Sequence, residues 1–281
     1  MEYVKSKDKI VVFKSADFSP KDILECGQIF RYRRCNNGDY IVLSGAHKAV
    51  IVENDDGYEI RTNDVDFFER FFDLQTDYNA IKNAIGCDEF VDKAIRQCPG
   101  VRILKNDFAE MAISFVISAN NHIKRIQQII DGICRECGDK IDDEDYAFPS
   151  IERLCQNDLD FYNHLHAGYR SKYLVKLAHE LRDFDIHSLD TKSTEECKVI
   201  LQKFSGVGPK VADCILLFGM GRQDVFPVDT WMEQVYHKYY ETGLKSRNSM
   251  REFFIKKFGQ NAGYAQQYLF YAQRTLKDKD L

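Results

Sequence analysis

The stretch from Leu201 to Trp231, which reads LQKFSGVGPKVADCILLFGMGRQDVFPVDTW, constrains the fold more than any other part of the chain. Gly206 and Gly208 mark a tight turn, and Pro209 follows at the first position of a helix, where a missing N–H is tolerated. Apolar residues then recur at the i, i+3, i+4 and i+7 positions of one helix face. The stretch therefore predicts a helix, a hairpin, a second helix, a loop and the start of a third helix.

Lys210 and Asp229 are the two residues of this stretch best suited to catalysis. Lys210 lies in the first turn of its helix. The dipole of that helix, together with burial, predicts a lowered pKa for the Lys210 amine, which could then attack carbon and form a Schiff base. Asp229 comes 229 − 210 = 19 residues later and could take up the lysine proton or stabilise an oxocarbenium ion. Cys214, four residues after Lys210, faces the same space. Taken alone, these residues slightly favour an ordinary Lys–Asp surface pair.

A hairpin that leads into a helix N-terminus also suits a phosphate, because it presents backbone N–H groups and a positive dipole end. The net charge of −5 argues mildly against a nucleic-acid partner, although a local basic cleft is compatible with an acidic chain. The chain of 281 residues is long enough for about two domains. No apolar run approaches the roughly 18 residues of a membrane span. Nine cysteines without a signal-peptide pattern predict reduced thiols in a cytosol.

Residues Lys9 to about Thr62 predict an antiparallel β meander. Asn37-Gly38 and Asp56-Gly57 are hairpin signals between short runs of apolar residues. Gly27, which precedes the first of these turns, is on its own best interpreted as a bulge or turn glycine.

Helical patterns dominate from Asp64 onward, and Asp64 itself is a candidate N-cap. The fold class is therefore predicted as α+β. We expect an antiparallel β domain over residues 1–80 and a mostly α-helical body over residues 81–281. The helix-hairpin-helix lies at about 194–220 within that body.

Three further features of the helical part bear on function. Asn120 and Asn121 interrupt two long apolar helical patterns. The segment from Tyr162 to Leu181 mixes basic and aromatic residues, which suits a phosphate backbone with a stacked base and equally suits a solvated helix face. Cys134 and Cys137 form a C-x-x-C pair without a second pair at metal-site spacing, so no metal site is predicted.

The segment F-S-G-V-G-P-K-V-A-D-C, followed by P-V-D, closely resembles the helix-hairpin-helix–Gly/Pro–Asp superfamily of base-excision DNA glycosylases. Four further blocks resemble one branch, the 8-oxoguanine DNA glycosylase/AP lyases, in that family's order along nearly the whole chain. These blocks are G-Q-I-F-R at Gly27–Arg31, S-A-N-N-x-I-x-R at Ser118–Arg125, G-Y-R at Gly168–Arg170, and F-G-x-x-A-G-x-A-Q-x-x-L-F at Phe258–Phe270. The resemblance implies a TBP-like β domain followed by a helical glycosylase body.

The resemblance implies a role for each matching residue. Lys210 would attack the sugar C1′, displace the damaged base and leave a Schiff base that collapses by β-elimination, with Asp229 assisting electrostatically. The extruded base would be held by Gly27, Cys214, Gln266 and Phe270. Guanine lacks the N7–H of 8-oxoguanine, so a backbone carbonyl of Gly27 facing N7 would select the oxidised base, at a penalty of ~1–3 kcal/mol for the wrong one.

The DNA-binding residues implied by the resemblance are Asn120, Arg125, Tyr169, Arg170, Gly206 and Gly208. Asn120 would fill the space that the base vacates, with Tyr169 as a wedge beside it. Arg125 and Arg170 would read the opposite cytosine, and the hairpin glycines would bind a phosphate. Trp231 stands where eukaryotic members often have a phosphate-binding histidine, and an indole cannot act as a cation.

The sequence thus predicts a bifunctional DNA glycosylase and AP lyase acting as a monomer on double-stranded DNA that contains 8-oxoguanine, without membrane contact. No cofactor or metal is implied as required, and a structural monovalent cation at the hairpin is allowed. The expected location is the cytoplasm of a bacterium or archaeon. Two alternatives stay open: a monofunctional alkylpurine DNA glycosylase, which would keep Asp229 without needing Lys210, and a non-catalytic helix-hairpin-helix DNA-binding protein.

Overall fold

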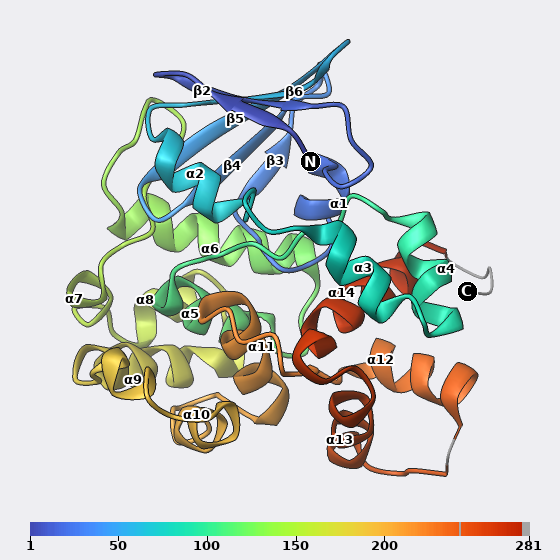
Figure 1. Ribbon diagram of the computed structural model, residues 1–281. Helices are drawn as coiled ribbons and strands as arrows, with labels where there is room; N and C mark the ends of the chain where they lie inside the picture. The colour runs from blue at the N-terminus through green and yellow to red at the C-terminus, as the bar shows by residue number, and fades with distance from the viewer. Residues whose placement is uncertain (242, 277–281) are drawn as a thin grey trace.

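An antiparallel sheet of six strands lies at one end of the molecule, against a larger body of helices (Figure 1). This computed structural model describes residues 1–241 and 243–276. The predicted α+β class is confirmed. The strands are β1 (Tyr3–Lys5), β2 (Lys9–Phe13), β3 (Tyr32–Arg34), β4 (Tyr40–Ser44), β5 (His47–Asn54) and β6 (Gly57–Thr62), in the spatial order β1-β2-β6-β5-β4-β3.

The predicted meander is confirmed for β3 to β6, which pair antiparallel in chain order around turns at Asn37-Gly38 and Asp56-Gly57. It does not extend to β2, which pairs with β6 instead of β3. A helix, α1 (Pro20–Leu24), lies between β2 and β3 in the chain. Five residues are too few to show a helical period, so the sequence pattern gave no sign of α1 beyond Ser19, whose side chain caps it.

Helices make up most of the remaining described chain. They are α2 (Val65–Phe71), α3 (Tyr78–Ile85), α4 (Glu89–Gln97), α5 (Phe108–Ser118), α6 (Ile123–Cys137), α7 (Ile151–Leu154), α8 (Leu159–His164), α9 (Ser171–Arg182), α10 (Thr194–Leu201), α11 (Pro209–Gly219), α12 (Thr230–Val235), α13 (Arg247–Phe258) and α14 (Ala262–Leu276). Short 3-10 turns occupy Gly168–Arg170, Ile186–Leu189 and Gly259–Asn261, and a π-helical turn occupies Tyr236–Tyr240. Asp64 caps α2 as predicted, accepting a hydrogen bond from the Phe67 N–H at 3.0 Å.

Two apolar cores stabilise these layers. The first lies between the sheet and the aromatic face of α2, and the second fills the helical body. At the centre of the second core, most residues of α5 are buried, and most of the buried ones are apolar. Phe115 of α5 stacks on Phe218 of α11, with ring centroids 5.4 Å apart. This contact fixes α11, whose first turn carries Lys210, to the centre of the molecule.

A buried ion pair joins the sheet to the helical body. The Arg31 guanidinium lies 3.4 Å from the Glu110 carboxylate of α5, which also accepts the Gly45 N–H at 2.7 Å. Leu104 belongs to the core on the sheet side, although it lies beyond residue 80. The division of the chain at residue 80 stays a prediction. Among the described residues, we find no helix that is both long and apolar enough to cross a membrane.

Candidate active site

The predicted helix-hairpin-helix is present, with α10 ending at Leu201 and α11 beginning at Pro209. Gly206 has a φ of +82°, the left-handed region that favours glycine. Ser205 anchors the hairpin to α9, because its backbone N–H and its hydroxyl both donate to the Glu180 carboxylate at 2.7 Å. The sequence pattern gave no sign of this anchor, since its two members are 25 residues apart.

Gly206 provides a testable consequence of this packing. A Cβ at position 206 would lie 2.9 Å from Cγ1 of Val116 and 3.0 Å from Cβ of Tyr173. We therefore expect Gly206→Ala to lower the free energy of unfolding by on the order of 1–3 kcal/mol and to weaken DNA binding. At Gly208 the φ is −85° and an added Cβ meets nothing within 4 Å. In thermal unfolding, the stability of Gly208→Ala should therefore be close to that of the parent protein. Equal losses of stability in both variants would contradict the strain argument.

Asp229 is the N-cap of α12 and also faces a cavity. Its Oδ1 accepts the backbone N–H groups of Trp231 and Met232, each at 3.0 Å. The cap fixes the carboxylate at the helix start and leaves Oδ2 without a hydrogen bond to the described residues. Helix cap and cavity residue are therefore compatible roles for Asp229.

One narrow cavity brings together all the residues that were predicted to act on the base and the sugar. It is lined by Gly27, Lys210, Cys214, Asp229, Gln266 and Phe270, together with Phe115, Phe218, Pro227 and Gln267. These residues come from the loop after α1, from α5, α11 and α14, and from the segment that leads into α12. Phe115 and Gln267 were not singled out from the sequence.

The predicted lowering of the Lys210 pKa is wrong. Burial lowers the pKa of this half-buried amine. The neighbouring Cys214 and Asp229 raise the pKa by more than burial lowers it, so the pKa lies above its usual value. The Lys210 ammonium also lies 5.3 Å from the centroid of the Phe115 ring, a favourable cation–π distance. The amine is therefore protonated at neutral pH and has to lose a proton before it can attack carbon.

Cys214 lines the cavity as a neutral thiol. Burial raises its pKa to about 11, against the opposing effect of Lys210. Because the thiolate is the nucleophilic form, a thiol with this pKa is a weak nucleophile at neutral pH. Its side chain is available as an apolar wall for a base.

Gln266 and Phe270 stand one turn apart on α14. Gln266 is 5% exposed, and its Oε1 has no hydrogen-bond partner among the described residues. The half-buried Phe270 ring leans on Gly27, where an added Cβ would lie 3.3 Å from Cε1 of Phe270 and 2.7 Å from the Arg274 guanidinium. The cavity is narrow, with a free volume of about 30 Å³.

Four of the six predicted DNA-binding residues line a second cavity, whereas Asn120 and Arg125 do not. It is lined by Val116, Ala119, Tyr169, Arg170, Tyr173, Phe204, Gly206, Val207 and Gly208. Tyr169 is 56% exposed, and its hydroxyl donates to the Ala119 carbonyl at 3.1 Å. The Tyr173 ring, which was not predicted, packs edge-on to Tyr169 with centroids 6.2 Å apart. The hairpin and the predicted wedge residue therefore share one hollow of the surface.

Arg170 is buried, and its guanidinium donates to the carbonyls of Ala119, Asn120 and Ala167. It thus holds the turn between α5 and α6, where Asn120 is exposed with a φ of +51°. Arg125, at the start of α6, donates to the His166 carbonyl at 3.2 Å. Both arginines are bonded to the protein backbone, and their contact with a base stays a prediction.

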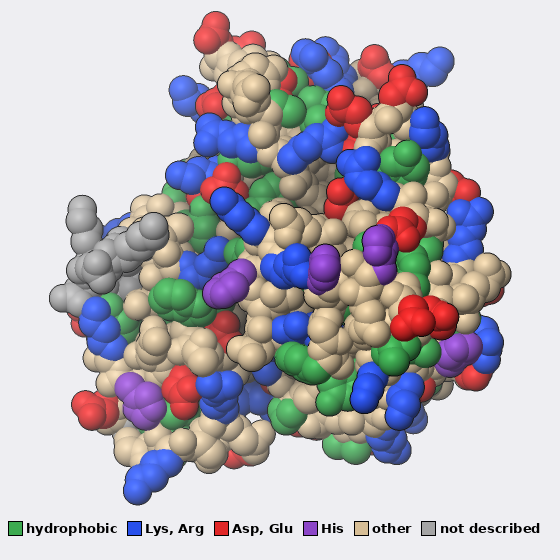
Figure 2. All heavy atoms as spheres, turned by 180° about the vertical axis from the view of Figure 1, so that it is seen from behind, with side chains coloured by type: hydrophobic (Ala, Val, Ile, Leu, Met, Phe, Trp, Pro, Cys, Tyr) green, Lys and Arg blue, Asp and Glu red, His purple; other side chains and the backbone are tan. Residues whose placement is uncertain are grey.

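Basic side chains are unevenly spread over the surface. Figure 2 shows Lys, Arg and His side chains gathered across the middle of one face of the molecule, with several Asp and Glu side chains nearer its edges. An acidic chain can therefore present a local basic surface, which answers the objection that the net charge of −5 raises against DNA binding.

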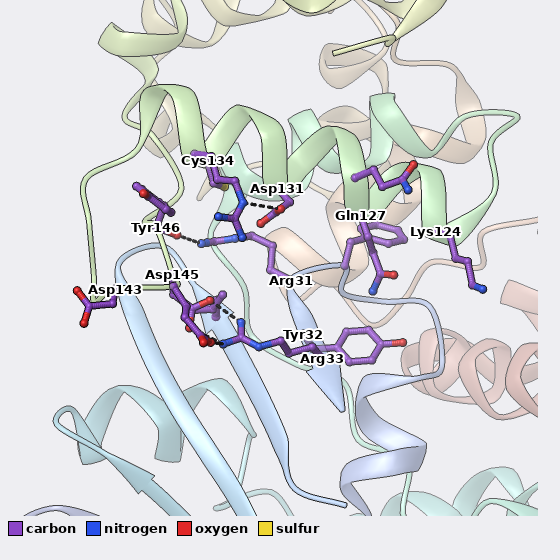
Figure 3. Close-up of a pocket in the computed structure, with 15 residues that line it drawn as sticks. Arg31, Tyr32, Arg33, Lys124, Gln127, Asp131, Cys134, Asp143, Asp145 and Tyr146 are labelled. Atoms are coloured by element: carbon purple, nitrogen blue, oxygen red, sulfur yellow. Dashed lines mark hydrogen bonds and ion pairs between the residues drawn. The ribbon is translucent and has the colours of Figure 1, made fainter. Parts of the chain in front are cut away.

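A larger groove of about 620 Å³ runs between β3 and α6 (Figure 3). Its arginines are paired: Arg33 binds the Asp145 carboxylate, Arg31 donates to the Tyr146 carbonyl, and Arg135 binds Asp131 at 2.8 Å. The Arg31 and Arg33 pairs tie the loop after α6 to β3 and the residue before it, whereas the Arg135 pair lies within α6. The groove contains neither Lys210 nor Asp229, so the catalytic candidates lie in the smaller cavity.

Two known families match successive parts of the chain. Residues 10–112 match the 8-oxoguanine DNA glycosylase N-terminal domain, and residues 113–260 match the HhH-GPD superfamily base excision DNA repair proteins. The fold and the site therefore define a DNA repair protein of the helix-hairpin-helix–GPD class. Within that class, the chain belongs to the 8-oxoguanine DNA glycosylase family.

Individual relatives agree with this assignment. The Clostridium acetobutylicum 8-oxoguanine glycosylase/lyase, solved with double-stranded DNA containing cytosine opposite 8-oxoG, is 34% identical with a TM-score of 0.92, over 99% of both chains. A probable N-glycosylase/DNA lyase of Methanothermobacter thermautotrophicus is 30% identical over 74% of this chain and 73% of its own. The N-glycosylase/DNA lyase OGG1 of Arabidopsis thaliana is 32% identical over 63% of this chain. The match spans about half (53%) of the length of that plant relative.

Proposed function

We propose that this protein is a bifunctional DNA glycosylase and lyase that removes 8-oxoguanine from double-stranded DNA and nicks the resulting abasic site. The observation that carries the proposal is the shared cavity, which places an amine, a carboxylate, an unpaired amide oxygen and an aromatic ring within one pocket. These are the groups needed to displace a base from a sugar and to bind that base while it leaves the duplex.

Lys210 acts as the nucleophile. The amine first loses a proton to the Asp229 carboxylate, which lies close enough to raise the Lys210 pKa. The nitrogen then bonds to C1′ as the C1′–N bond to the base breaks, and the base leaves with that electron pair and takes up a proton. The sugar ring opens to a Schiff base. Loss of a C2′ proton then expels the 3′ phosphate, which nicks the strand.

The base is recognised from three sides. Phe270 and Cys214 hold its two faces, and the Gln266 amide binds its Watson–Crick edge. The Gly27 carbonyl accepts the N7–H that 8-oxoguanine has and guanine lacks. Leaving a buried carbonyl unpaired costs about 1–3 kcal/mol, which disfavours guanine.

The second cavity holds the DNA around the lesion. Asn120, exposed on its turn, fills the space left by the extruded base, and Tyr169 wedges beside it. Arg125 and Arg170 exchange their backbone partners for the cytosine opposite the lesion. The glycines of the hairpin bind a backbone phosphate.

Phe270 tests the proposed pocket. We expect Phe270→Ala to weaken binding to a duplex with 8-oxoguanine by roughly tenfold or more, because base–aromatic stacking contributes about 1–3 kcal/mol. Affinity for undamaged duplex should change little, as measured by fluorescence anisotropy. Phe13, 40% exposed on the sheet, offers a matched control in Phe13→Ala. Equal losses on both duplexes for the Phe270 variant would rule out a stacking role.

The proposed activity is tested with duplexes that carry 8-oxoguanine or an alkylated purine, each opposite cytosine. We expect release of 8-oxoguanine together with a strand nick. Release of alkylated purine without a nick would favour the monofunctional alternative. Binding without release of either base would favour the non-catalytic alternative.

A further inference from the structure

We infer that Gln267 is a positioning residue that sets the direction of the Gly27 carbonyl and thereby the discrimination between 8-oxoguanine and guanine. The inference rests on the proposed role of Gly27 in the function above. Gln267 itself does not need to touch the base.

Gln267 forms a buried bond from α14 to the loop that carries Gly27. Its side chain is 2% exposed and lines the same cavity as Lys210. Its Nε2 donates to the Cys26 carbonyl at 3.1 Å. Successive side chains of a helix point about 100° apart. The Gln266 amide can therefore face the cavity while the Gln267 amide bonds to the loop that carries Gly27.

The Cys26 carbonyl is part of the peptide plane that ends at the Gly27 Cα. A bond to that carbonyl therefore fixes the plane on the N-terminal side of Gly27. Gly27 has a φ of +83°, and glycine populates many backbone conformations, so nothing in its own chemistry fixes the next carbonyl. Its direction has to be imposed by the neighbouring residues.

Gln28 provides the fixed point on the other side. It is fully buried, its Nε2 donates to the Ile23 carbonyl at 2.9 Å and the Arg102 carbonyl at 2.7 Å, and its Oε1 accepts the Leu104 N–H at 2.8 Å. Gly27 is thus held between two side-chain amides. Of these two, only Gln267 comes from the helix that also carries Gln266 and Phe270.

Loss of the Gln267 bond would release the peptide on one side of Gly27. The Gly27 carbonyl could then turn away from N7, and the Gln28 N–H of the same peptide could turn toward it. A carbonyl selects the N7–H of 8-oxoguanine, whereas an N–H accepts the lone pair at N7 of guanine. The released loop would therefore bind 8-oxoguanine less well and guanine better.

The test compares affinities for matched duplexes that contain 8-oxoguanine or guanine opposite cytosine, and measures nicking of a preformed abasic site, which has no base to recognise. Gln267→Met keeps the side-chain length and removes the donor. We expect it to lower the affinity ratio of 8-oxoguanine over guanine by about tenfold, the order expected for one unpaired buried carbonyl, with a much smaller loss of abasic-site nicking. Gln273→Met makes the same change on the same helix, outside the residues that line the cavity, and should leave the ratio unchanged.

Gln267→Glu adds a readout that a purely structural role would not give. An ionised carboxylate repels the Cys26 carbonyl, whereas a protonated one can donate to it. Discrimination by this variant should therefore improve as the pH falls, while the parent shows no such recovery. An unchanged ratio in both variants, or an equal loss of abasic-site nicking, would overturn the inference. Failure of the parent protein to release 8-oxoguanine would instead reject the proposed function.

Discussion

Replacing Lys210 with glutamine is expected to abolish strand nicking and to slow release of 8-oxoguanine by on the order of 10⁴-fold or more, as removal of a covalent nucleophile does in other enzymes. Glutamine keeps a polar side chain of similar length but cannot form a Schiff base. Binding of the damaged duplex should survive, because the base-binding residues are unchanged. Single-turnover release of the base, followed by denaturing gel analysis of the strand, measures both steps.

Lys203 provides the matched control for this variant. It lies seven residues earlier and is exposed on the turn after α10. Lys203→Gln makes the same chemical change near the same hairpin, away from the cavity, and should keep the parent's base release. Undiminished nicking by Lys210→Gln would contradict the assignment of the nucleophile.

Replacing Asp229 with asparagine should slow base release by about 10²–10⁴-fold, the range typical of a lost general base. The Lys210 ammonium would lose its proton acceptor, and the developing positive charge on the sugar would lose a carboxylate. Asparagine caps helices about as well as aspartate, so the free energy of unfolding should change little. Asp158, which caps α8, provides the control Asp158→Asn. Base release and the melting temperature are measured for each variant. Full activity of Asp229→Asn would mean that Asp229 acts only as a helix cap.

The parts of the site that could be predicted from the sequence are those fixed by local chemistry. The hairpin follows from two glycines and a proline, and the cap at Asp229 follows from an aspartate before a helix. The proximity of Gly27 to Gln266 and Phe270 cannot be predicted from the local sequence pattern. It was implied by the family resemblance, and the structure shows that the three line one cavity.

The parts that could not be predicted depend on neighbours distant in the chain. The Lys210 pKa was expected to fall because only the helix dipole and burial were considered, whereas Asp229 and Cys214 outweigh burial once the fold brings them close. Gln267 gave no signal in the sequence, because its only distinguishing feature is a bond to Cys26, 241 residues away. The helix α1 was missed because five residues carry no period.

The most direct test of the account is reduction with sodium borohydride during turnover of a duplex that contains 8-oxoguanine opposite cytosine. A Schiff base between Lys210 and C1′ would be reduced to a stable covalent bond. We predict a cross-linked protein–DNA complex whose modified peptide contains Lys210, and no such complex with Lys210→Gln. Absence of a cross-link in the parent protein while base release proceeds, or a cross-link at another residue, would contradict the central claim.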